Sequence, residues 1–335
     1  MAESITGVSG DRAAARGRQH GSQRDSRPGP PLLRVLALPA GPVRIRRTAP
    51  DALSNLVAVL ELAADGRLRC AAGTRRPLAA TVRLVEDALV AGDYYGGPEG
   101  DAGDGGEPIA AFAWPMLLQA GGLARLDGTG LQLTPRGQAV LARPSYRCVG
   151  ALWERWRGSV SQDEFSRIEA IRGQRKTGTL TSVASRRAAV AAGLAALEPG
   201  VWADVDAFFA ILRTQAAPLT VTASPLARWG LYLEDPRHGS LGPAGEKAWA
   251  AVEGRYALCV LFEYAATLGV VDVAYAGPQG ARGDYRDLWG ADQRGSLSRY
   301  DGLTAIRVSE LGAAILHDPD ALDALGLPLP RRILR

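Results

Sequence analysis

Lysine, histidine and cysteine are scarce in this chain of 335 residues. Its only lysines, Lys176 and Lys247, do not follow a G-x-x-x-x-G turn, which excludes a P-loop for nucleotide hydrolysis. The histidines His20, His238 and His317 lie far apart, and no cysteine or histidine pair has the spacing of metal ligands. We therefore expect no metal site, no cofactor and no catalytic residues. An enzyme would need His238 and His317 to meet in one pocket.

Long apolar runs and cysteine pairs are missing as well. The most apolar stretch, Tyr256 to Val273, is interrupted by Glu263 and Asp272, so we expect no membrane contact. No apolar segment follows the first arginines, as it does in a secretory signal, and the three cysteines are unclustered. These features predict a cytoplasmic protein with free thiols.

The composition is that of a globular protein with a mild positive charge. Hydrophobic residues make up 47% of the chain, enough for a substantial core, and the formal net charge is +4. This charge favours a polyanionic partner only weakly. Abundant arginine, alanine and glycine are also typical of a GC-rich bacterial genome, so an ordinary solvated surface stays open as an explanation of the arginines.

One pattern occurs twice along the chain. The two copies are LQLTPRGQAVL, residues 131–141, and IRVSELGAAIL, residues 306–316. They align Thr134 with Ser309 and Gly137 with Gly312, and each follows a helix that ends at a glycine and a strand. Both copies predict a helix, a glycine, a strand, a turn, a second strand and a capped helix. A repeat on this scale indicates two copies of one supersecondary unit. We predict that Gly137 and Gly312 occupy matching sites.

The repeat divides the chain into five segments. A tail with few large apolar residues, predicted to be disordered, precedes the first unit. The predicted segments are a tail at 1–31, a first unit at 32–143, a helical bridge at 144–181, a second unit at 182–318 and a C-terminal tail at 319–335. Within the bridge, Phe165, Ile168 and Ile171 are spaced as one helix face, with Ser161 as its predicted cap.

The motifs LTPRG at 133–137, VSELG at 308–312 and PGVW at 199–202 resemble those of the winged-helix superfamily, here in tandem. The resemblance implies a fold that is mainly α with small β-hairpin wings, and two winged-helix units joined by a helical bridge. It also implies DNA binding, commonly with the third helix in the major groove and the wing on the backbone.

The third helices differ from those that contact bases. Base recognition needs polar side chains on the outer face of that helix. The third helix of the first unit, Ile109 to Ala120, offers only one polar side chain, Gln119. The third helix of the second unit, Arg255 to Leu268, begins with Arg255 and continues with mostly apolar residues. We expect both helices to be buried or to face a protein partner.

Basic residues gather instead in the bridge and in the long second wing. The candidate nucleic-acid contacts are Arg172, Arg175, Lys176, Arg186, Arg187, Arg282, Arg286, Arg294 and Arg299. Tyr285, Trp289 and Tyr300 lie between the wing arginines, a combination that suits sugar-phosphate contact and stacking.

These features predict a non-enzymatic subunit of a larger bacterial assembly that contacts double-stranded DNA independently of its sequence. The alternative is a protein interaction scaffold or dimerisation module that does not bind DNA. Salt-dependent duplex binding distinguishes the two, because each neutralised phosphate contributes about one unit to the log-log slope.

Overall fold

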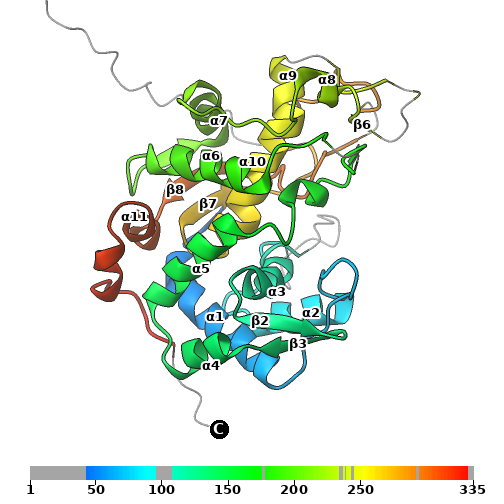
Figure 1. The fold of residues 1–335 in the computed structure, drawn as a ribbon. Helices are drawn as coiled ribbons and strands as arrows, with labels where there is room; N and C mark the ends of the chain where they lie inside the picture. Colours follow the sequence, from blue (N-terminus) through cyan, green and yellow to red (C-terminus); the bar gives the residue numbers. More distant parts are fainter. Residues whose placement is uncertain are drawn as a thin grey trace, which may run out of the picture. The chain divides into compact units, whose positions relative to one another are not determined.

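The computed structural model describes residues 43–95, 108–175, 178–233, 237, 239–242, 245–291 and 294–330. In this part of the chain the fold is mixed, with mostly helices and small antiparallel sheets (Figure 1). Lys176 and His238 lie outside the described residues. No helix in the described ranges is long and apolar enough to cross a membrane.

The first half of the chain contains the predicted helix, hairpin and capped helix. Its elements are β1 (Arg44–Arg46), α1 (Ala49–Ala64), α2 (Ala79–Ala88), α3 (Ala110–Ala120), the hairpin of β2 (Ala124–Asp127) and β3 (Gly130–Leu133), and α4 (Pro135–Ala142). The sequence predicts Asp51 as the N-cap of the first helix, but α1 begins at Ala49 with Thr48 at the N-cap position. Pro50 lies in the first turn, where a missing N–H costs nothing. The sequence predicts a short strand at 67–70, but these residues form only isolated bridges, from Arg69 to Gly130 and from Cys70 to Pro77.

The bridge begins as predicted and then departs from the prediction. In α5 (Tyr146–Gly158), Val149, Leu152, Trp153 and Trp156 face the core. The predicted helix capped by Ser161 is wrong. A short 3-10 turn, Glu164–Arg167, stands there, and the strand β4 (Ile171–Arg172) follows it.

The cap of the 3-10 turn is Asp163, whose carboxylate accepts a hydrogen bond of 2.9 Å from the Phe165 N–H. The physical reason for the error is a long-range contact. Asp163 and its neighbour Glu164 pair with two arginines of the next helix, and a continued helix would carry these carboxylates away from them.

The second half repeats the order at greater length. Its elements are α6 (Val183–Ala195), β5 (Trp202–Asp204), α7 (Val205–Thr214), α8 (Pro225–Arg228), β6 (Tyr232–Leu233), α9 (Glu246–Trp249), α10 (Arg255–Cys259), β7 (Val271–Tyr275), β8 (Leu303–Val308) and α11 (Glu310–His317), with a final 3-10 turn η5 (Pro319–Asp323). Ser182 and Asp204 cap α6 and α7 by accepting hydrogen bonds from the Ser185 and Ala207 N–H groups. The sequence predicts a helix start near Ser182 and a cap at Asp204, and both are confirmed.

α9 and α10 belong to one helix that includes two π-helical stretches, Ala250–Gly254 and Val260–Ala265. Every residue from 250 to 265 is buried. Buried charges therefore occur along this helix, at Glu253, Arg255 and Glu263, and each must find its partner inside the protein.

The larger sheet pairs a strand from the start of the described chain with strands from its second half. Its strand order is β1-β7-β8-β5, and all neighbours are antiparallel. β1 adds to the outer edge of the second hairpin, with Arg46 opposite Val273. All described residues fall within one compact unit, Leu36–Arg335, and one hydrophobic cluster extends from Ala49 to Leu327. The two copies of the repeat therefore share a core.

The caps of α4 and α11 show the repeat in atomic detail. Thr134 accepts a hydrogen bond from the Gly137 N–H at 3.1 Å, and Ser309 accepts one from the Gly312 N–H at 2.8 Å. Each cap hydroxyl also donates to a carbonyl of the glycine that ends the preceding helix, Gly122 in one copy and Gly269 in the other. The two glycines adopt φ values of +67° and +75°.

Gly137 and Gly312 lie against backbone, where no larger side chain fits. A Cβ on Gly137 would lie 2.1 Å from the Leu123 carbonyl oxygen, and a Cβ on Gly312 would lie 1.9 Å from that of Val270. Both glycines are the third residue of their helix and approach the strand entry in the same way. The prediction that they occupy matching sites is confirmed.

Candidate nucleic-acid interface

The third helix of the first copy is part of the core. All residues of α3 from Ala110 to Leu118 are buried. Gln119, the one polar residue that could contact a base, donates its amide N–H groups to the backbone carbonyls of Arg75 at 3.0 Å and Pro115 at 3.1 Å. Since these N–H groups are used within the protein, α3 offers no side-chain donor to a base edge.

The corresponding helix of the second copy is buried to the same extent. Arg255 is fully buried, and its guanidinium lies 3.1 Å from Asp301 and 2.6 Å from Asp284. Burial disfavours its charge, but these two carboxylates outweigh burial and raise the pKa of Arg255 further. This arginine fastens the long wing to α10 and is not available to a ligand.

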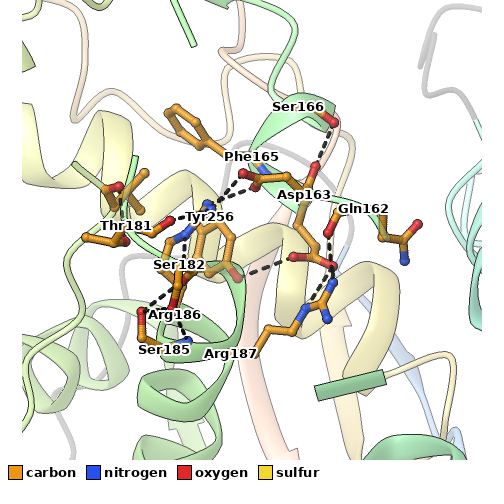
Figure 2. A network of polar contacts seen from close by, with 12 residues as sticks. Gln162, Asp163, Phe165, Ser166, Thr181, Ser182, Ser185, Arg186, Arg187 and Tyr256 are labelled. Carbon is orange, nitrogen blue, oxygen red and sulfur yellow. Dashed lines mark hydrogen bonds and ion pairs between the residues drawn. The ribbon is translucent and has the colours of Figure 1, made fainter. Parts of the chain in front are cut away.

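Arg186 and Arg187 are also interior residues, as Figure 2 shows. Arg186 donates two hydrogen bonds to Asp163, of 2.8 and 2.6 Å, in the bidentate geometry of a strong ion pair. Arg187 donates from Nε to Glu164 at 3.0 Å and also donates to the Ser159 carbonyl at 2.6 Å. Their burial leaves neither guanidinium for a phosphate, so we remove both residues from the predicted set of nucleic-acid contacts.

The guanidinium groups of both ion pairs lie over aromatic rings. The Arg187 guanidinium lies 4.6 Å from the Trp156 ring centre, and that of Arg186 lies 4.9 Å from the ring of Tyr256. The Tyr256 hydroxyl donates to Glu164 at 3.3 Å. Burial raises the pKa of Glu164, and the Arg187 charge opposes that rise. The cluster joins the bridge to α6 and α10, so its role is structural.

The wing arginines are mostly engaged too. Arg282 pairs with Asp206 and Asp284, and Arg299 lies 3.8 Å from Glu169. Arg294 is half-buried. The predicted stacking surface is wrong for Tyr285 and Tyr300, both of which are buried.

Buried carboxylates explain the position of Tyr300, whose hydroxyl donates to Glu263 beside Arg167. Of the three predicted aromatics, Trp289 remains at the surface, with 72% of its area exposed. The wing therefore keeps one stacking residue.

Three of the predicted arginines remain exposed, namely Arg172, Arg175 and Arg286. Two large apolar side chains that sequence reasoning missed, Leu226 and Trp229, are 79% and 55% exposed. The sequence offered little signal for Trp229, because it lies in the mostly apolar segment SPLARWGLYL, residues 224–233. We use the name β4–β6 surface for six exposed residues of the bridge, the segment around α8 and the wing, namely Arg172, Arg175, Leu226, Trp229, Arg286 and Trp289.

Close backbone contacts hold the β4–β6 surface together. Arg172 lies opposite Tyr232 in the β4–β6 pair. A Cβ on Gly173 would lie 1.9 Å from the Gly230 carbonyl oxygen, next to Trp229. A Cβ on Gly290, next to Trp289, would lie 3.3 Å from the Leu233 carbonyl oxygen. The bridge, the insert around α8 and the wing therefore meet at this surface.

No group of three histidine, cysteine or acidic residues within the described ranges could hold a metal ion. Two cavities in the same ranges, of about 400 and 260 Å³, are open grooves along the first copy. His317 is exposed at the end of α11.

No protein-family model matches the chain, and no curated protein or solved structure is detectably similar to it. The function must therefore be inferred from the residues of this chain and their geometry.

Proposed function

We propose that this chain is a non-enzymatic tandem winged-helix protein that contacts the backbone of duplex DNA without recognising bases, as a subunit of a larger bacterial assembly. The fold part of the proposal is supported by the two matching caps at Thr134 and Ser309 and by the shared order of helices and hairpins. The two units are joined by the bridge that contains α5 and β4.

One observation carries the functional part. The helices that would enter a major groove are buried, whereas Arg172, Arg175 and Arg286 are exposed on the β4–β6 surface. Guanidinium groups bind phosphates whatever the base sequence, and an exposed tryptophan such as Trp289 can stack on a base or pack on a sugar. This combination supports weak, sequence-independent affinity.

Charge reversal at Arg172 and Arg175 tests the proposal. We expect Arg172→Glu with Arg175→Glu to weaken binding to all duplexes alike. The log-log salt slope should flatten by about 0.9 for each phosphate that the variant no longer neutralises. Anisotropy titrations over a salt series measure both effects. The matched control is Arg83→Glu, an exposed arginine on α2 far from the bridge in sequence, which should leave the slope unchanged. Equal binding by the doubly reversed protein would place the DNA contact elsewhere.

A second candidate function, a protein interaction scaffold, is favoured by the exposed apolar side chains. Leu226, Trp229 and Trp289 expose more than half of their area, and tryptophan next to arginine is typical of the energetic centre of a protein interface. This candidate predicts no duplex binding at low salt. It also predicts that Trp229→Ser with Trp289→Ser abolishes capture of the partner or of a second copy.

A further inference from the structure

A groove between α4 and α5 offers an apolar floor with a basic rim. Its volume is about 260 Å³. Leu123, Val140 and Leu152 form the floor. The rim consists of Arg136, Arg147 and Arg155, and the remaining lining residues are Gly121, Cys148 and Ala151. Among the described residues that line the groove none is acidic, and every charged group on its rim is positive.

The rim arginines differ in their partners. Arg147 donates from Nε to Asp323 at 2.6 Å, and its guanidinium lies 3.6 Å from Asp320. Arg136 and Arg155 are exposed, and no ion pair is found for either in the described part of the chain. Two positive charges of the described rim therefore stand beside an apolar floor without an acidic partner.

The chain itself shows what kind of segment α5 binds beside the groove. The segment 318–330, DPDALDALGLPLP, contains three acidic residues and four leucines, and its 3-10 turn η5 packs on α5. Leu322 is buried against Gly150, with its Cδ1 2.9 Å from the place of a Cβ on that glycine. The Tyr146 hydroxyl donates to the Pro328 carbonyl at 2.7 Å. Asp320 and Asp323 pair with Arg147, and Arg147 also lines the groove.

We propose that the groove binds a short acidic, leucine-containing segment of a partner protein. A leucine side chain would lie on the floor formed by Leu123, Val140 and Leu152, and flanking carboxylates would pair with Arg136 and Arg155. Charge complementarity supports this occupant, and so does continuity with the intramolecular contact through Arg147. A bare phosphate backbone would use the arginines but leave the floor uncovered. The proposal does not depend on DNA binding at the β4–β6 surface.

Cys148 provides a direct reporter of occupancy because it lines the groove and is half-exposed. The other two thiols, Cys70 and Cys259, are buried. Burial also raises the pKa of the Cys70 thiol to about 11, so little reactive thiolate forms there at neutral pH. A thiol reagent should therefore modify Cys148 first, and a ligand in the groove should slow that reaction.

The test uses the full chain and a fluorescent peptide with the sequence of residues 318–330. We expect saturable binding that slows Cys148 modification. Arg136→Glu with Arg155→Glu should weaken binding about tenfold or more, because two charge-assisted contacts become repulsive. Ala151→Trp, which fills the groove without changing its charge, should weaken binding similarly. Arg83→Glu is the matched control and should bind as the parent protein does.

Three results would overturn the proposal. Undiminished peptide binding by the Arg136→Glu, Arg155→Glu protein would mean that the peptide displaces residues 318–330 from α5 and ignores the groove. Equal affinity for a peptide whose leucines are replaced by serine would show that the floor contributes nothing. Protection of Cys148 by a DNA duplex but not by the peptide would assign the rim to nucleic acid.

Discussion

Replacing Gly312 with alanine is expected to lower the free energy of unfolding by about 3 kcal/mol, and Gly137→Ala should have a similar effect. The added Cβ would lie about as close to a carbonyl oxygen as a hydrogen-bonded hydrogen does, at 1.9 Å in one copy and 2.1 Å in the other. These oxygens belong to the backbone of Val270 and Leu123, so no side-chain rotation can relieve the clash. Urea titrations of the two variants measure the loss.

Gly158→Ala is the matched control, because this glycine ends α5 with no atom within 4 Å of an added Cβ. Its stability should equal or slightly exceed that of the parent chain, since alanine is the better helix former. If Gly137→Ala and Gly312→Ala both have the same free energy of unfolding as the parent protein, α4 and α11 do not pack against the backbone as described. If only one of them is destabilised, the two sites are not equivalent.

Removing the arginine of the fully buried Arg187–Glu164 ion pair should lower the free energy of unfolding at least as strongly. We expect Arg187→Met to cost about 3 to 5 kcal/mol, because Glu164 would be left as an unpaired charge in the interior. Both side chains are fully buried. The control is Arg157→Met, which breaks a partly exposed pair with Glu154 and should cost less than about 1 kcal/mol.

The stability that Arg187→Met loses should depend on pH in a defined direction. Burial raises the pKa of Glu164 above its ordinary value even with Arg187 present, and removing Arg187 takes away the charge that opposes the rise. The folded variant then binds a proton more tightly than the unfolded chain does, so its stability falls as pH increases through the interval between the two pKa values. On acidification, the deficit of Arg187→Met relative to the parent should therefore narrow.

Adding Glu164→Gln to Arg187→Met removes the stranded charge and should recover part of the stability at neutral pH. A deficit that is independent of pH, with no recovery in the double variant, would mean that Arg187 acts through packing on Trp156 rather than through charge.

Local signals in the sequence were sufficient for much of the fold. The caps at Asp204 and Ser309 were predicted because each side chain can accept a hydrogen bond from the N–H groups of the first helical turn. The matching glycines follow from the aligned copies. The burial of α3 follows from its nearly continuous apolar sequence, which leaves no polar face for solvent.

Long-range pairing could not be predicted in this way. Arg186 and Arg187 are dense positive charges in the sequence, and only the folded chain shows that Asp163 and Glu164 meet them from 23 residues away. The same holds for Tyr285 and Tyr300, which fold inward against the buried helix at Arg255 and Glu263. The number of arginines in a sequence therefore overestimates the number available to nucleic acid when buried carboxylates pair with some of them.

The central claim, sequence-independent contact with duplex DNA, is tested most directly by anisotropy titrations of the full chain. Two duplexes of equal length and unrelated sequence are compared over a salt series that begins at low ionic strength. We expect equal affinities for both duplexes and the same linear decrease of log affinity with log salt, with a slope of about −0.9 for each phosphate neutralised. No binding at the lowest salt, or a strong preference for one duplex, would contradict it.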